Sequence, residues 1–179
     1  MSDNLQNVED SKEMPAAVTA IFEMAKKGLA KLPILGPALW LYARDPVRRF
    51  LFVSDIDWAI LPPVVLDQCR LYLKDSLPCA FFSWAFVDGA VADRLRTGQS
   101  KLAPHEWNVG EDVWVIDAVA PFGQLDEMLL ELRQTVLAGR KVSTLLPDPE
   151  NIGALIVREF SPEEARSGGA QSEGGAASN

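Results

Sequence analysis

The order of apolar and polar residues along the chain predicts a domain that mixes helices with strands. We expect an N-terminal amphipathic helix over 15–32, beginning near Pro15 and ended by Pro33. Its apolar stripe comprises Val18, Ile21, Phe22, Ala25, Leu29 and Leu32. A second helical stretch, PALWLYARDPVRRF, is interrupted at Pro46, and Asp45 is placed to cap the segment after the proline.

An alternation of period two begins after the two prolines at 62 and 63 and predicts a β-hairpin. QCRLYLK alternates as a half-exposed strand does, and Asp75 and Ser76 supply residues that favour a turn. CAFFSWAF then forms a near-continuous apolar run, which is typical of a central strand. A short helix over 88–97, opened by Asp88, and a loop over 98–111 come after this hairpin.

The next predicted strand, DVWVIDAV, carries an acid among apolar residues. Strict alternation would place Val113, Val115, Asp117 and Val119 on one face of the sheet. A carboxylate buried in such a place costs several kcal/mol, roughly, unless it is paired, hydrogen-bonded or protonated. Asp117 is therefore a candidate functional residue. The same acid can instead cap the APFG turn after it or pair with an arginine.

The remainder of the chain completes an α/β domain. An amphipathic helix follows APFG and ends at Gly139, and its stripe is Leu125, Met128, Leu129, Leu132 and Val136. KVSTLL and GALIVREF are two further strands, so we expect a three-layer α/β fold over a single domain, 14–160. Residues 1–13 and 161–179 offer little apolar surface to bury and are expected to be disordered.

The charge and composition of the chain indicate which binding partners and which cellular location to expect. The formal net charge is −8, of which −3 lies in residues 1–13 and −2 in residues 161–179. Without a basic stripe, a nucleic-acid partner is not expected. Two cysteines outside any CxxC pair and a single histidine predict neither a disulfide framework nor a metal site. We find no signal peptide and no integral membrane segment, and expect a cytoplasmic protein.

Four blocks of sequence, in order and at similar spacing, resemble the RTX-toxin-activating lysine acyltransferases, also called the haemolysin-activator family. They are LGPALWLYARDPVRRF, ILPPV, LPCAFFSWAFVDG and EWNVGEDVWVIDAVAPFG. The resemblance runs from about Leu35 to Leu145 and covers most of the expected domain. It implies a GNAT-like acyltransferase fold, with a central, mostly antiparallel sheet flanked by helices.

The resemblance also implies a reaction and a set of site residues. Members of that family move a fatty acyl chain from acyl carrier protein to the ε-amine of an internal lysine of an RTX protoxin, and need no bound cofactor. Asp117 matches their essential aspartate, and can accept the proton that the lysine ammonium must lose before it attacks a thioester. Two stretches are candidates for substrate binding, Ala120, Pro121, Phe122 and Gly123 in the turn and Ser83 and Trp84 in the SWA strand.

One motif departs from the family. Its Ser-Pro-x-His-Arg segment carries the essential histidine, and here Arg48 stands at the histidine and Asp45 at the serine. An arginine cannot act as a general base, although it can hold a carbonyl or phosphate oxygen as a fixed cation. Asp45 can also form an ordinary salt bridge with Arg48 or Arg49. His105, the single histidine, lies in the APHEW loop and is a further candidate for the base.

Two hypotheses from different classes arise from these residues. The first is a protein-lysine acyltransferase that uses acyl carrier protein and has its base relocated. The second is a catalytically silent relative that binds acyl carrier protein, a toxin or an active paralogue, which the loss of the histidine at Arg48 favours. A membrane-surface adaptor acting through the 15–32 helix is a weaker third interpretation. The sequence leaves a homodimer open.

Overall fold

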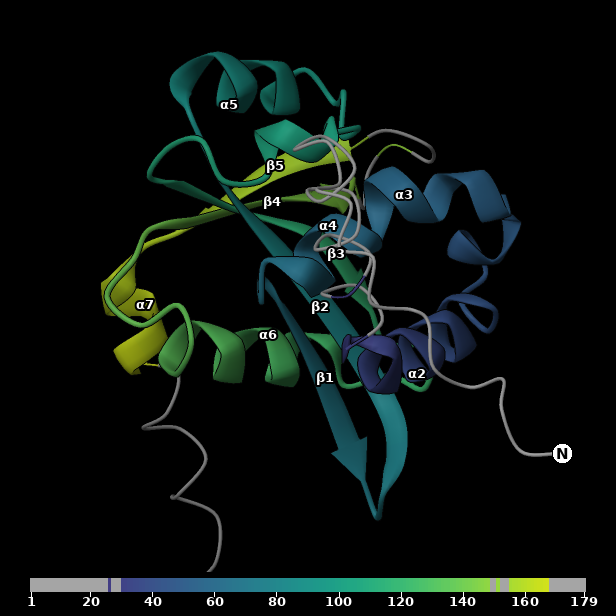
Figure 1. The fold of residues 1–179 in the computed structure, drawn as a ribbon. Helices are drawn as coiled ribbons and strands as arrows, with labels where there is room; N and C mark the ends of the chain where they lie inside the picture. The colour runs from purple at the N-terminus through teal and green to yellow at the C-terminus, as the bar shows by residue number, and fades with distance from the viewer. Residues whose placement is uncertain (1–25, 27–29, 149–150, 152–154, 168–179) are drawn as a thin grey trace, which may run out of the picture.

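The computed structural model describes residues 26, 30–148, 151 and 155–167, which form a five-stranded sheet flanked by helices (Figure 1). The strands lie in the sheet in chain order, and are β1 (Cys69–Lys74), β2 (Leu77–Val87), β3 (Asp112–Val119), β4 (Val142–Pro147) and β5 (Leu155–Phe160). β3 and β4 are parallel, whereas the other neighbouring pairs are antiparallel. The α/β class and the mostly antiparallel sheet are as the sequence predicted.

The helices cover both faces of this sheet. They are α2 (Leu32–Tyr42), α3 (Ile56–Ala59), α4 (Leu61–Val65), α5 (Gly89–Arg96), α6 (Leu125–Gln134) and α7 (Pro162–Ser167). On one face, Leu129 and Leu132 of α6 pack against Phe82 and Trp84 of β2. On the other face, helices α2 to α4 form one apolar cluster and α5 with the loop after it forms a second, so the domain has three layers (Figure 1).

The local signals in the sequence produced the predicted elements around the hairpin. Asp75 and Ser76 both adopt positive φ, at 50° and 68°, and reverse the chain between β1 and β2. Asp88 accepts a hydrogen bond from the backbone N–H of Val91 and so caps α5. The structure thus confirms the predicted turn and helix cap. Both could be predicted from the sequence because each depends on a few neighbouring residues.

The N-terminal helix boundary differs from the prediction. Pro33 was expected to end a helix, and instead lies in the first turn of α2, which runs on to Tyr42. A proline is tolerated there because the first N–H groups of a helix have no intrahelical partner. Lys26 and Ala30 are helical, and the rest of the predicted helix up to residue 29 lies outside the described residues.

The C-terminal part of the domain shows two further differences. Helix α6 ends at Gln134, before Gly139, and a turn in which Leu137 N–H donates to the Leu132 carbonyl buries Leu137 in place of Val136. Helix α7 lies within the tail that was expected to be disordered from residue 161. Ser161 and Glu164 form a reciprocal capping box at its start, and the sequence SPEE carried that signal.

Candidate active site

A β-bulge in β3 decides where Asp117 points. Ser83 of β2 pairs with Asp117 and Trp84 pairs with Val115, so Ile116 is an extra residue in β3. An extra residue reverses the alternation of side chains beyond it. The predicted face was therefore wrong: Val113 and Val115 pack towards α6, whereas Asp117 and Ile116 both line a cavity on the α2 face.

Both carboxylate oxygens of Asp117 have partners from distant parts of the chain. Nε and Nη2 of Arg48 lie 2.8 Å and 2.6 Å from Oδ1, and the hydroxyl of Tyr42 donates to Oδ2 at 2.8 Å. The Asp117 side chain is 11% exposed and that of Arg48 is 38% exposed, so this ion pair lies at the edge of the core. Of the alternatives that the sequence left open for Asp117, the structure shows pairing with an arginine.

Arg48 is held at this place by the turn that Asp45 makes. Oδ1 of Asp45 accepts hydrogen bonds from the backbone N–H groups of Val47 and Arg48, at 2.9 Å and 2.8 Å. The carboxylate therefore fixes the turn that leads into the short 3-10 helix Arg48–Phe50, whose N-cap residue is Val47. Asp45 acts on the site through the backbone that carries the Arg48 side chain.

The pKa values of the two partners reflect the charge of Asp117. Burial raises the pKa of the Tyr42 hydroxyl well above its ordinary value, and the Asp117 carboxylate raises it further. Burial lowers the pKa of the Arg48 guanidinium, but the charge and hydrogen bond of Asp117 together outweigh it, and the pKa is raised. Tyr42 is therefore a neutral hydrogen-bond donor and Arg48 a fixed cation.

Two cavities meet at Arg48. The first, which we call the Asp117 cavity, has a volume of about 220 Å³. Its lining includes Trp58, Leu102, Trp107, Ile116, Asp117 and Leu145. The second, which we call the Ile60 cavity, has a volume of about 250 Å³. Its lining includes Leu39, Tyr42, Leu51, Phe52, Ile56 and Ile60.

The APFG turn leads from β3 into α6 beside these residues. Gly123 N–H donates to the Ala120 carbonyl, and Gly123 and Gln124 adopt positive φ, at 91° and 66°. Phe122 is exposed, with its ring 5.8 Å from that of Trp40 on α2. The turn thus presents an aromatic side chain and the start of a helix next to the strand end that carries Asp117.

The other predicted substrate-binding residues and the histidine lie in different surroundings. Ser83 is buried on the Asp117 side of β2, and Trp84 is packed in the core on the α6 face. His105 is exposed in the 3-10 helix Pro104–Glu106 and does not line the Asp117 cavity. The structure therefore brings Arg48 and Asp117 into contact and does not bring His105 to them.

Sequence reasoning missed Tyr42, which completes the set around the carboxylate. Tyr42 ends α2, the residue is 3% exposed, and its ring lies 5.9 Å from that of Phe81. A tyrosine in an otherwise apolar helical run was the available signal, because a buried hydroxyl needs a partner.

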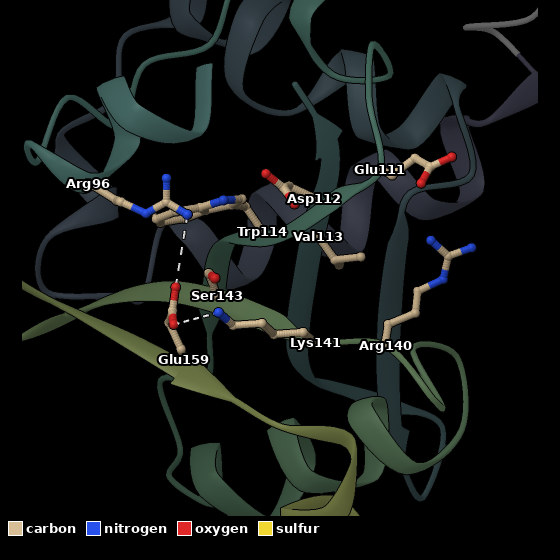
Figure 2. Close-up of a pocket in the computed structure, with 9 residues that line it drawn as sticks. All are labelled: Arg96, Glu111, Asp112, Val113, Trp114, Arg140, Lys141, Ser143 and Glu159. Atoms are coloured by element: carbon tan, nitrogen blue, oxygen red, sulfur yellow. Dashed lines mark ion pairs between the residues drawn. The ribbon is translucent and has the colours of Figure 1, made fainter. Parts of the chain in front are cut away.

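A third cavity lies at the start of β3 and β4, away from the predicted residues (Figure 2). It mixes charges of both signs: Glu159 pairs with Lys141 at 2.6 Å and with Arg96 at 3.9 Å.

Among the described residues, no group of His, Cys, Asp and Glu is placed to hold a metal ion. Nor does any helix in this part of the chain have the length and apolarity to cross a membrane.

Comparison with known proteins identifies one family. A sequence model of the RTX toxin acyltransferase family matches residues 27–161. The RTX-II toxin-activating lysine-acyltransferase ApxIIC of Actinobacillus pleuropneumoniae is 33% identical over 125 residues, which cover 69% of this chain and 78% of that protein. The lysine-acyltransferase RtxC of Vibrio cholerae is 31% identical over 116 residues, 63% of this chain and 76% of that protein. The protein-lysine myristoyltransferase HlyC of Escherichia coli is 34% identical over 92 residues, 51% of this chain and 54% of that protein.

Proposed function

This chain belongs to the RTX toxin acyltransferase family and is an acyltransferase of the toxin-activating type, and we propose that it moves a fatty acyl chain from acyl carrier protein to the ε-amine of an internal lysine in an RTX-type protein. The observation that carries this proposal is the contact between Arg48 and Asp117 in a cavity open to a substrate. The two positions that the family resemblance singled out, 69 residues apart, meet there.

The pair offers complementary charges for the two reacting groups. A lysine ammonium must lose a proton before it can attack, and Asp117 is the carboxylate placed to receive it. Arg48 reaches Asp117 through Nε and Nη2, and we assign its remaining nitrogen, Nη1, to the thioester oxygen. As that oxygen gains negative charge, a preorganised cation beside it stabilises the transition state.

Bonds and protons balance in this reaction. The lysine nitrogen forms a bond to the thioester carbonyl carbon, and the carbon–oxygen π electrons move onto the oxygen beside Arg48. Collapse of this intermediate re-forms the carbonyl and breaks the carbon–sulfur bond. One proton of the ammonium passes through Asp117 to water, and the second leaves the amide nitrogen with the thiolate, which becomes a thiol. Tyr42 holds Asp117 in place, since its hydroxyl donates to the second carboxylate oxygen.

The proposal places the protein in the cytoplasm, because that is where it would meet acyl carrier protein. Neither charge in the site comes from a second copy of the chain, so the homodimer that the sequence left open is a separate question. Analytical ultracentrifugation across a concentration series settles it, since a dimer sediments faster as concentration rises.

The test is direct detection of acylated lysine. The full-length chain is incubated with acyl-loaded carrier protein and a candidate RTX protein, and the RTX protein is digested and analysed by mass spectrometry. We expect a mass increase equal to one fatty acyl group on a lysine, and none with carrier protein lacking the acyl chain. If several RTX proteins from toxin-encoding bacteria show no acylated lysine, the proposed acyl donor and acceptor are wrong.

A further inference from the structure

The two cavities that meet at Arg48 differ in the charged residues on their walls. The Asp117 cavity is lined by Asp117 as well as by Arg48, whereas Arg48 and Arg49 are the charged residues that line the Ile60 cavity, together with the polar Tyr42. A cation entering the Ile60 cavity would meet like charge without an acid in its lining, which is unfavourable in a partly desolvated place. The walls therefore distinguish a cationic substrate group from an apolar one.

The Ile60 cavity is otherwise apolar from its floor to its rim. Ile60 at the floor is buried, whereas Phe52 and Val53 at the rim are 76% and 85% exposed. Large apolar side chains exposed together around a cavity usually mark a place where another apolar group binds. Apolar side chains thus run from the buried Ile60 to the exposed Phe52 and Val53, an arrangement that suits a long apolar chain.

Hydrogen bonds accepted by the Asp55 carboxylate hold this rim in a defined conformation. Its Oδ2 accepts from the backbone N–H of Phe52 at 2.8 Å, and its Oδ1 accepts from the indole N–H of Trp58 at 3.0 Å. Trp58 lines the Asp117 cavity, so one carboxylate ties together the walls of the two cavities. A preorganised rim loses less conformational entropy when a ligand binds.

We propose that the two cavities separate the two substrates: the Ile60 cavity binds the fatty acyl chain, and the Asp117 cavity admits the acceptor lysine. This assignment rests on the proposed function. It places the acyl carbonyl at Arg48, where the cavities meet, and the lysine nitrogen beside Asp117. Nζ of Lys101 lies 4.6 Å from the ring centroid of Trp58, so this ring already contacts one ammonium group. Because Trp58 lines the Asp117 cavity, this contact supports binding of the acceptor lysine there.

The size of the Ile60 cavity sets an expectation for chain length. The cavity of about 250 Å³ accommodates only part of a long acyl chain, so a longer chain continues over Phe52 and Val53. Each buried methylene should tighten binding about fourfold, the equivalent of about 0.8 kcal/mol.

The experiment measures binding of hydrolysis-resistant acyl-pantetheine thioether analogues to the full-length chain by titration calorimetry. The acyl series runs from eight to sixteen carbons. Three variants each add a bulky side chain at an exposed position: Val53→Trp at the Ile60 cavity, Leu155→Trp at the Asp117 cavity, and Val47→Trp in neither. Because all three positions are solvent-exposed, we expect similar melting temperatures, which circular dichroism checks.

We expect Val53→Trp to weaken binding of the longest chain at least tenfold and to flatten the dependence on chain length. Leu155→Trp and Val47→Trp should stay within about twofold of wild type. A loss with Leu155→Trp and none with Val53→Trp would place the acyl chain in the Asp117 cavity and overturn the assignment. Unchanged binding in both would also overturn it.

This binding assay does not depend on turnover, so the two proposals can fail separately. If the analogues bind with the expected pattern but no lysine is acylated, the proposed function fails alone. If lysine is acylated and Val53→Trp leaves both binding and chain-length preference unchanged, the substrate assignment fails alone.

Discussion

Asp117→Asn separates a catalytic role of the carboxylate from a structural one. Asparagine is nearly isosteric but carries no charge, and its side chain offers one acceptor oxygen and one donor amide in place of two acceptors. Its oxygen can still accept from Arg48. Its amide can donate to the Tyr42 oxygen if the tyrosine hydroxyl hydrogen turns away. The hydrogen bonds can therefore re-form, while the charge and basicity are lost.

The expected loss of stability depends on how exposed the ion pair between Asp117 and Arg48 is. Breaking a fully buried ion pair costs about 3–5 kcal/mol, and a surface pair contributes about 0–1 kcal/mol. With Asp117 at 11% and Arg48 at 38% exposure, the guanidinium can regain part of its hydration. We expect Asp117→Asn to lower the free energy of unfolding by about 1–3 kcal/mol, less than a typical domain stability of about 5–15 kcal/mol.

Acyl transfer should fall much further than stability. Loss of a positioned proton acceptor typically costs about 10²–10⁴ in rate, so transfer per folded molecule should be reduced by at least a hundredfold. Urea unfolding gives the stability, and the mass-spectrometric lysine assay gives the rate. Tyr42→Phe is the matched control, because it removes one hydrogen bond to Asp117 and leaves the carboxylate. If Asp117→Asn unfolds readily and the folded fraction keeps full activity, the aspartate is structural and the proposed mechanism is wrong.

Three further changes test other parts of the structure. Arg48→His should reduce acyl transfer because a neutral imidazole no longer fixes Asp117; activity above wild type that rises through about pH 6 to 7 would show instead that a base had been missing. Glu106→Gln should lower the free energy of unfolding by about 1 kcal/mol at pH 7, because Arg94 holds the Glu106 carboxylate with two hydrogen bonds of 2.8 Å and 2.6 Å and lowers its pKa to about 2. Since this pKa lies below the unfolded value of about 4.3, the difference should shrink as pH falls below about 4.3 and vanish at about pH 1 in denaturant titrations, and a difference that persists at about pH 1 would contradict the ion pair as its cause. Gly110→Ala should destabilise by about 1–3 kcal/mol, since its Cβ would overlap the backbone at the end of β2, whereas Gly89→Ala at the open start of α5 should be neutral or slightly stabilising in thermal melts.

The sequence by itself determined the elements and much of their order. The hairpin of β1 and β2, the strand β3, the cap at Asp88 and the turn at Asp45 all arise from hydrophobic period or from side chains bonding to nearby backbone. Such signals are local, and a single chain shows them directly. The family assignment was also within reach, because it depends on short blocks of residues in a fixed order.

Only the tertiary structure decided what surrounds the acid. Whether Asp117 faces α6 or α2 depends on the bulge at Ile116, and nothing in the alternating pattern of DVWVIDAV marks where an extra residue enters the strand. Its partners Arg48 and Tyr42 lie 69 and 75 residues earlier in the chain. Contacts over such separations arise from how α2 and the Asp45 turn pack on the sheet, since the free energy of packing depends on all the surfaces brought together and on no single segment.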